Sequence, residues 1–407
     1  MMKNYIQQGS RTYWQAIVAL FLGSFVTFAI LYCTQPLIPV FSREFMISPA
    51  VASLSVSLTT ASLAVFMIAI AWLSDAAGRK SMMTTALLAS SALAVALAFA
   101  PNFLLLLLVR ALQGALLGGF PAIAMAYINE EFDPRITGLV MGIYVSGTAI
   151  GGMMGRMIIG ALTDLFSWHI ALAAIGMLSL AVSVWFRFAL PASQNFSPQK
   201  RILKEIAPVL IRNVEQPLLL SLYCIGFLIM GSFVACYNYL GYTLMAAPYN
   251  LSQTVVGFIF GFYLVGTISS TLMGKLTDLI GNAKVLCIAL GIMLAGCLIS
   301  LNAHLAVKLL GVTVFTFGFF GSHAVASGWV AKSAAADRAQ ASSLYLLFYY
   351  VGSSVIGFVG GEFLRWAGWN GLVLLVSGAL VIALLIGIIL AQTARAKLSC
   401  LQTAKQG

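Results

Sequence analysis

The sequence predicts an all-α membrane protein of twelve transmembrane helices, organised as two pseudo-symmetric halves of six helices each. The first observation is composition, since 61% of the residues are hydrophobic and only 8% are charged, whereas soluble domains average about 25% charged residues. The second is length, because many apolar runs approach the roughly 20 residues that cross a bilayer as a helix. The third is a charged motif that recurs about half a chain later. The runs do not alternate apolar and polar residues, which disfavours a β-barrel.

Twelve apolar segments are expected to be the spans. They are residues 14–38, 50–72, 82–100, 103–128, 137–162 and 168–190 in the first half, and 217–241, 252–273, 284–302, 305–330, 340–361 and 370–391 in the second. Between the halves lies the longest polar stretch, which carries Lys200, Arg201, Lys204 and Arg212. The expected domains are an N-terminal half at 1–190, a basic cytoplasmic linker at 191–213 and a C-terminal half at 214–407.

The net charge of the chain is +11. Nucleic acid is one partner for a basic chain, but the excess of Lys and Arg in the cytoplasmic loops of membrane proteins explains the charge without it. With the N-terminus placed in the cytoplasm, the predicted outer loops hold only Arg43, Lys308 and Arg365, and Arg110 and Arg156 lie within spans. All other Lys and Arg fall on the inner side, which predicts that both termini are cytoplasmic. The six cysteines show no paired spacing and are expected to be free core residues.

The charged motif at residues 71–80 lies between the second and third spans, and a weaker copy at 274–281 follows the eighth. Asp75 and Asp278 hold equivalent places, 203 residues apart. Each half has an even number of spans and therefore the same orientation, so an axis along the membrane normal is expected to relate them. A binding cavity is then expected between the halves, near the midplane of the bilayer.

The residues of these motifs resemble a known family. Leu73-x-Asp75-x-x-Gly78-Arg79-Lys80 is similar to the loop signature of the major facilitator superfamily, with Ala71 where that signature has glycine. Arg110-x-x-Gln113-Gly114 resembles the superfamily's second motif. The glycine-rich fifth span, with Gly147, Gly151, Gly152, Gly155 and Gly160, resembles the motif of its efflux branch, although Arg156 stands where that motif has proline.

Three further segments resemble the YnfM-like bacterial inner-membrane transporters, which are grouped under acriflavine sensitivity. They are Tyr32-Cys-Thr-Gln35-Pro36, Gly151-Gly-Met-Met-Gly155-Arg156 and Ala341-Ser-Ser-Leu-Tyr345. The resemblance implies a monomeric secondary transporter in the bilayer of the bacterial inner membrane, which exports a small molecule by antiport with protons. Import of a small anionic or polar solute is the alternative, and a non-transporting membrane sensor is a third reading.

The loop residues are expected to gate the cavity. Asp75 would face the positive end of a neighbouring helix or a nearby arginine, and so lock the cytoplasmic side in one state. Gly78 permits a tight turn, while Arg79 and Lys80 either share the gating role or only satisfy the orientation rule. The full expected gating set is Asp75, Gly78, Arg79, Lys80, Gly274, Asp278 and Gly281.

Arg110 and Arg156 are the strongest candidates for the substrate or proton pathway, because a charge inside a span costs a few kcal/mol. Arg110 would bind an anionic or polar substrate or tune a titrating group. Alternatively it ties the fourth helix to the first, through Gln35 or Tyr32. Arg156 would face the cavity, or would link through an intermediate group to Asp164, which lies about two helical turns further along.

The other pathway candidates are polar or aromatic. His323 is the histidine deepest in a span and would carry a proton, with a hydrogen-bonded packing role as the alternative. Polar side chains near the interface of the two repeats are also where substrate contacts are expected. Besides the two arginines, the pathway set is Tyr32, Gln35, Gln113, Asn238, Tyr239, His323, Tyr345 and Tyr349.

None of the eleven acidic residues lies in the middle of a predicted span. A cavity with two arginines and no acid would repel cations, which favours an anionic or neutral polar substrate, whereas the branch name favours a cationic dye. No Walker-type loop, His-Glu-x-x-His or Cys-x-x-Cys pattern occurs. ATP hydrolysis, a metal site, a cofactor and an enzymatic activity are therefore not expected.

Overall fold

The structure is a computed structural model that describes residues 5–196, 203–334 and 338–403, without the side chains of residues 68, 71–72, 74–77, 203–207, 339 and 394–403. Among the described residues, eleven helices are long and apolar enough to cross a membrane. The last of these contains non-helical residues at Ala367 and Gly368, which separate the eleventh predicted span from the twelfth. The predicted all-helical membrane fold is therefore confirmed.

Most helices begin and end within a few residues of the predicted spans, and some continue further at their C-terminal ends. In the first half they are α1 Arg11–Tyr32, η1 Gln35–Leu37, α2 Ile38–Glu44, α3 Pro49–Ala77, α4 Arg79–Leu97, α5 Phe103–Leu117, α6 Gly119–Glu131, α7 Thr137–Leu165 and α8 Trp168–Ala189. In the second half they are α9 Leu203–Glu215, α10 Pro217–Met245, α11 Gln253–Phe258, η2 Ile259–Phe262, α12 Tyr263–Ile280, α13 Asn282–Ile299, α14 Leu305–Ser333 and α15 Arg338–Thr403.

Polar residues in front of apolar runs determine where several helices begin. Ser10, Asn102, Ser167 and Ser252 each accept a hydrogen bond from the backbone N–H three residues further on, at 2.9–3.3 Å. Such caps satisfy one of the four backbone donors that the first turn of a helix leaves unpaired. The helix starts are thus encoded locally, which is why the sequence alone predicts them well.

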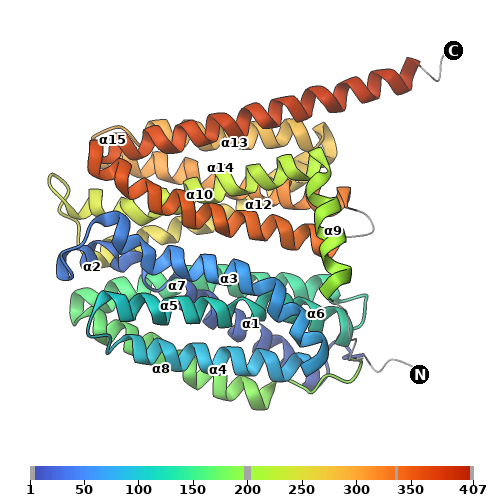
Figure 1. Ribbon diagram of the computed structural model, residues 1–407, viewed down its shortest axis with the longest axis horizontal. Helices are drawn as coiled ribbons and strands as arrows, with labels where there is room; N and C mark the ends of the chain where they lie inside the picture. Colours follow the sequence, from blue (N-terminus) through green and yellow to red (C-terminus); the bar gives the residue numbers. More distant parts are fainter. Residues whose placement is uncertain (1–4, 197–202, 335–337, 404–407) are drawn as a thin grey trace. The chain divides into compact units, whose positions relative to one another are not determined.

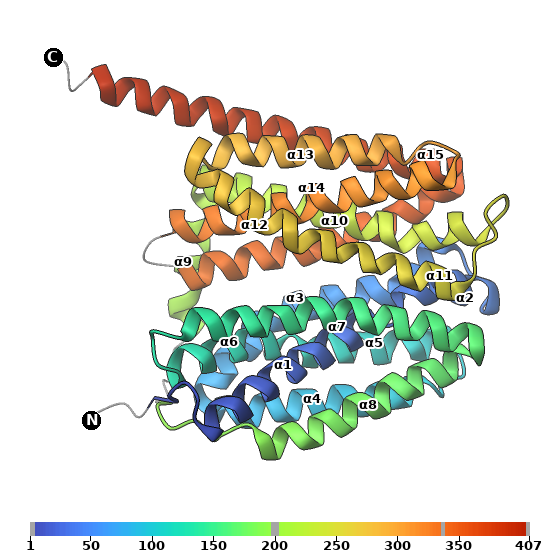
Figure 2. The same ribbon diagram turned by 180° about the vertical axis from the view of Figure 1, so that it is seen from behind.

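The chain forms two compact units. Unit 1 comprises Met1–Ile202 and Leu244–Gly261, and unit 2 comprises Leu203–Thr243 and Phe262–Gly407. Within unit 1, α1 packs on α7, α3 on α5, and α4 on α8 (Figure 1). Helix α11 also packs on α7. Within unit 2, α12 and α13 pack on α14, and α13 also packs on α15 (Figure 2). The short helix α11, at the start of the eighth span, therefore belongs to unit 1 although it lies in the second half of the sequence.

The glycines of α7 form the face that contacts α1. A Cβ atom at Gly147 would lie 2.6 Å from the carbonyl oxygen of Phe21, and one at Gly151 would lie 2.2 Å from that of Phe25. Both separations are far below van der Waals contact, so only glycine permits this approach of the two backbones. The spacing of four residues on both helices keeps the contact on one face of each. The close packing brings Arg156 of α7 alongside the end of α1.

Helix α9 lies in the stretch predicted as a polar linker. It contains an internal proline, Pro208, and packs against α15. In its sequence, apolar residues recur three or four positions apart, at Leu203, Ile206 and Leu210, which is the spacing typical of a helix. The stretch is predicted to be a linker because of its basic residues, although its apolar residues recur at helical spacing.

Candidate functional site

The first loop motif forms a sharp turn between α3 and α4. Gly78 adopts a φ of 90°, and Gly281, its counterpart between α12 and α13, adopts a φ of 87°. This left-handed region is open to glycine and costly for other residues. The same conformation at the same place in both copies supports the internal repeat. The side chain of Asp75 lies outside the part of the chain that the structure describes, so its gating role stays a prediction.

Arg79 is the motif residue with a defined ion pair. Its side chain is nearly buried, and its Nη2 and Nε donate to the two carboxylate oxygens of Glu130 at 2.8 and 3.2 Å. Two parallel bonds of this kind combine the charge attraction with a fixed geometry. Glu130 lies at the end of α6, so the pair connects the loop motif to the fourth span. The sequence interpretation did not single out Glu130, because it looked for acids in the middle of spans and Glu130 lies near the end of one.

The second copy of the motif differs in its side chains. Asp278 and Lys275 are exposed, Gly274 is half-buried, and Gly281 is followed by Asn282 and not by a base. Lys80 in the first copy is also half-buried. The backbone turn is therefore repeated, whereas the arginine that forms the ion pair occurs in one copy.

Arg110 is fully buried on α5. Its guanidinium donates to the backbone carbonyl oxygens of Ile30 at 2.9 Å, Leu31 at 2.6 Å and Ser55 at 2.8 Å. Its Nη1 also donates to Oε1 of Gln113 at 2.9 Å. A cation at the last carbonyls of α1 is favoured by the helix dipole. Arg110 thus ties α5 to α1 and α3 through backbone carbonyls, and not through Gln35 or Tyr32.

Gln113 completes this arrangement one turn further along α5. While its Oε1 accepts from Arg110, its Nε2 donates to the carbonyl oxygen of Ser90 on α4, at 3.2 Å. Both side chains of the predicted pair are completely buried. The structure therefore places Arg110 and Gln113 together, as members of a network that joins four helices.

Arg156 is surrounded in a different way. It is 3% exposed, and its Nε donates to Oε1 of Gln35 at 2.6 Å. The guanidinium carbon lies 4.1 Å from the ring centroid of Tyr32 and 4.8 Å from that of Phe260. Such contacts between a cation and an aromatic face stabilise the charge where water is excluded. Arg156 also donates to its own helix, at the carbonyl oxygen of Gly152. Three of the predicted pathway residues thus meet at one place.

A second set of contacts connects this place to α11. Both carboxylate oxygens of Asp164, on α7, accept hydrogen bonds from backbone N–H groups, Gln253 at 3.1 Å and Thr254 at 2.6 Å. The side chain of Gln253 donates to the carbonyl oxygen of Pro36, next to Gln35. Arg156 is therefore connected to Asp164 indirectly, through Gln35, its neighbour Pro36, and Gln253. We define the outer network as Tyr32, Gln35, Arg156, Asp164, Gln253 and Phe260.

The unit 2 candidates form an aromatic cluster. Nδ1 of His323 lies 3.0 Å from the hydroxyl oxygen of Tyr345, and its ring centroid lies 4.7 Å from that of Tyr349. Phe319, one turn away on α14, stacks on Phe233 of α10 at 3.7 Å between centroids. The structure thus places three predicted residues together on α14 and α15.

Asn238 and Tyr239 are buried on α10. The hydroxyl of Tyr239 donates to the carbonyl oxygen of Gly357 on α15 at 2.7 Å. That bond packs two helices of unit 2 together. Among the described residues, no group of three or more His, Cys, Asp or Glu side chains is arranged to hold a metal ion.

Helices of membrane length joined by short charged turns, with arginines buried inside the bundle, define a polytopic membrane protein. The sequence model of the Major Facilitator Superfamily matches residues 20–248 and 222–401. The chain belongs to this superfamily and is a multi-pass membrane transporter.

Similar proteins span nearly the whole chain. It is 46% identical to the uncharacterized MFS-type transporter YybF of Bacillus subtilis, over 93% of this chain and 94% of that one. It is 42% identical to the inner membrane transport protein YnfM of Escherichia coli, over 94% and 92%. It is 30% identical to the multi-drug resistance efflux pump PmrA of Streptococcus pneumoniae, over 84% and 86%.

The fold is also found in solved structures. A bacterial homolog of the human lysosomal transporter Spinster, in an inward-facing and occupied conformation, matches with a TM-score of 0.76. The match covers 95% of this chain and 98% of that one, at 16% sequence identity. At this identity the similarity establishes the fold alone.

Proposed function

We propose that the protein exports a small molecule across the bacterial inner membrane by alternating access, with protons as the coupling ion. The division into halves at 1–190 and 214–407, joined by the segment 191–213, is part of this proposal, as is the cytoplasmic location of both termini. The relative PmrA is named as a multi-drug efflux pump, which favours export. The turn conformation shared by Gly78 and Gly281 is consistent with a gate repeated in both halves.

The observation that carries the proposal is the outer network. It joins the end of the first span, the fifth span and the start of the eighth through side chains, at Arg156 to Gln35 and Asp164 to Gln253 and Thr254. Alternating access requires side-chain contacts that form in one state and separate in the other, and this network, although it lies within unit 1, joins the first half of the sequence to the second at Gln253 and Thr254. Backbone–backbone packing alone would not offer discrete groups that can exchange partners.

The charge of Arg156 indicates which substrates fit. Its guanidinium is a planar donor of the geometry that binds carboxylates and phosphates bidentately, and it lies over the rings of Tyr32 and Phe260. A substrate with an aromatic ring and an anionic or strongly polar group would replace Gln35 and the rings as partners. Import of such a solute is the second candidate function, because these contacts favour a substrate class without favouring a direction.

The test is transport by purified protein in proteoliposomes under an imposed pH gradient. The panel contains cationic dyes, aromatic carboxylates and neutral sugars, with internal pH recorded. We expect proton flux that depends on a panel member, and loss of that flux in Arg156→Gln. The matched control is Arg365→Gln, because Arg365 is exposed and pairs only with Glu362 among the contacts described.

The outcomes separate the alternatives. Flux with an aromatic carboxylate that fails in Arg156→Gln supports the network as the binding site. Flux with a cationic dye that survives in Arg156→Gln makes Arg156 structural. Proton movement absent with every panel member would count against proton coupling, and accumulation against the gradient only in the inward direction would favour import.

A further inference from the structure

Helices α4 and α8 of unit 1 pack side by side along a seam of small and polar residues (Figure 1). The hydroxyl oxygens of Ser91 on α4 and Ser183 on α8 lie 3.0 Å apart, and both residues are buried. Further along, a Cβ atom at Gly176 of α8 would lie 2.6 Å from the backbone nitrogen of Val95 on α4. The contact moves forward on α4 as it moves back on α8, so the two helices are antiparallel. The start of α4 and the end of α8 therefore lie at the same end of unit 1.

Two bases lie on this seam at that end. Lys80 is in the first turn of α4 and Arg187 is in the last turn of α8. Arg187 follows Ser183 by four residues and Lys80 precedes Ser91 by eleven, which are about one and three helical turns and keep both bases on the faces that form the seam. Lys80 is half-buried and Arg187 is exposed. They are close enough for their positive charges to repel each other.

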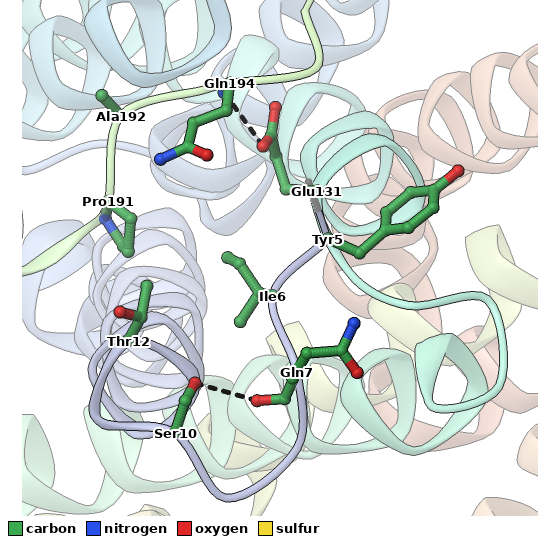
Figure 3. Close-up of a pocket in the computed structure, with 9 residues that line it drawn as sticks. All are labelled: Tyr5, Ile6, Gln7, Ser10, Thr12, Glu131, Pro191, Ala192 and Gln194. Carbon is green, nitrogen blue, oxygen red and sulfur yellow. Dashed lines mark hydrogen bonds between the residues drawn. The ribbon is translucent and has the colours of Figure 1, made fainter. Parts of the chain in front are cut away.

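No carboxylate compensates this pair within the described part of the chain. The acids next to the start of α4 are at the end of α6, which packs on α4. Glu130 pairs with Arg79. Glu131 accepts hydrogen bonds from the backbone N–H groups of Gln194 at 3.0 Å and Asn195 at 2.9 Å. Figure 3 shows the carboxylate of Glu131 directed at the backbone of Gln194. Both acids are therefore engaged by other groups.

The pair of bases is costly without a counter-ion. Two like charges repel each other most where little water surrounds them, and a base in the first turn of a helix also opposes the helix dipole. The orientation rule of membrane proteins explains why bases gather on one side of the membrane. It does not require two of them on one seam. The arrangement therefore indicates that an anion from outside the chain compensates their charge.

The surroundings of the pair indicate where this anion comes from. Beside Arg187 on α8, the side chains of Trp185 and Phe188 are 41% and 77% exposed. Exposed aromatic side chains at the ends of transmembrane helices are typical of the headgroup region of a bilayer. The bases thus lie at the depth of lipid phosphates, next to a surface that acyl chains can cover.

We propose that Lys80 and Arg187 form a binding site for the headgroup of an anionic lipid, at the end of the seam between α4 and α8. Basic pockets between transmembrane helices are suited to such headgroups. The ammonium group of Lys80 supplies a point charge, and the planar fork of Arg187 donates two parallel hydrogen bonds to a phosphate. Lys80 directly follows Arg79, so the lipid adjoins the loop motif expected to gate. The site needs no transport activity and goes beyond the proposed function.

Native mass spectrometry of the purified full-length protein tests the site directly. The protein in detergent micelles is titrated with phosphatidylglycerol, and with phosphatidylcholine of the same acyl chains as the reference. We expect phosphatidylglycerol to bind more tightly, and Lys80→Gln and Arg187→Gln each to weaken its binding about fivefold. The matched control, Arg135→Gln, removes an exposed base of the same unit and should leave binding within about twofold. Equal binding of the two lipids, or equal losses in all three variants, would overturn the site.

A labelling experiment on the unaltered protein does not depend on the folding of a variant. The protein is placed in nanodiscs of phosphatidylcholine with or without phosphatidylglycerol, treated with an amine-acetylating reagent, and the modification of each lysine is quantified by mass spectrometry. Relative to Lys275, an exposed lysine of unit 2, we expect phosphatidylglycerol to slow the modification of Lys80 about fivefold.

The same experiment distinguishes a lipid headgroup from a free anion. Inorganic phosphate added to nanodiscs of phosphatidylcholine alone should leave the modification rate of Lys80 unchanged, because a free phosphate lacks the acyl chains that hold a headgroup at the surface. Protection of Lys80 by inorganic phosphate alone would show a site for a free anion and overturn the lipid site. Equal slowing at Lys80 and Lys275 would show only the general effect of a negative surface, and would also overturn it.

Discussion

Arg110 and Arg156 resemble each other in the sequence and differ in the structure. Both are buried arginines inside predicted spans of unit 1. Arg110 donates to three backbone carbonyls on two neighbouring helices. Arg156 donates to the side chain of Gln35 on η1 and to the carbonyl oxygen of Gly152 on its own helix, and it lies over the rings of Tyr32 and Phe260. Backbone carbonyls keep their places as long as the helices do, whereas side chains can rotate away from one partner to another.

The difference separates a structural charge from one that can take part in a cycle. Removing Arg110 leaves the last carbonyls of α1 without a donor in a buried place, which is costly in every state of the protein. Removing Arg156, by contrast, destabilises only the state in which Gln35, Tyr32 and Phe260 contact it. A charge within a span is thus not by itself a sign of function, and the type of its partners decides.

The largest effect is expected for Arg110→Lys. A lysine keeps the charge and loses the planar fork, so about two charge-assisted hydrogen bonds disappear and stability falls by roughly 3 kcal/mol or more. Thermal unfolding of the purified protein, followed by intrinsic fluorescence, measures this loss. The control is Arg365→Lys, where Arg365 is exposed. A native melting temperature combined with altered transport would place Arg110 in the substrate pathway.

Arg156→Lys should change transport more than stability. The loss of the contact with Gln35 and of stacking on two rings is worth about 2 kcal/mol in the state described here. We expect the transport rate to fall about tenfold or more while the purified protein still unfolds cooperatively. Initial rates in proteoliposomes and melting temperatures are measured on the same preparations. If the transport rate and the melting temperature of Arg156→Lys fall as far as those of Arg110→Lys, the two arginines have the same structural role.

A matched pair of substitutions sharpens the comparison. Gln113→Leu removes a side-chain acceptor of Arg110, and Gln35→Leu removes a side-chain acceptor of Arg156. Each should cost about 1–2 kcal/mol of stability. Only Gln35→Leu is expected to alter the KM for substrate, because in the proposed cycle Arg156 exchanges partners and Arg110 does not. Equal kinetic effects of the two variants would contradict the distinction.

The smallest effect is expected for Asp164→Asn. The amide oxygen still accepts one of the two backbone N–H groups at the start of α11, so about 1 kcal/mol is lost. That loss would shift an equilibrium between states about fivefold. The accessibility of a cysteine placed at Thr254, measured by its rate of alkylation, reports the shift, with Thr163→Val on the same turn of α7 as the control. No change in alkylation would remove Asp164 from the outer network's function.

Much of the candidate site can be predicted from the sequence alone. The turn glycines, the buried arginines and the pair Gln113 and Arg110 follow from motif spacing and from the cost of charge in an apolar span. Glu130, Glu131 and Gln253 do not stand out, because acids and amides at helix ends are common there for capping and solubility. Their partners lie about 50 to 220 residues away, beyond any local signal.

The sequence by itself determined the twelve spans, the turns between them and the repeat of the two halves. These features depend on the length of apolar runs, on caps and on glycine conformation, which are properties of neighbouring residues. Only the tertiary structure decided that Arg110 binds carbonyls, that Arg156 meets Gln35 and Phe260, and that Glu131 holds the linker. The physical reason is that a buried donor takes whichever acceptor the packing of distant helices brings within about 3 Å.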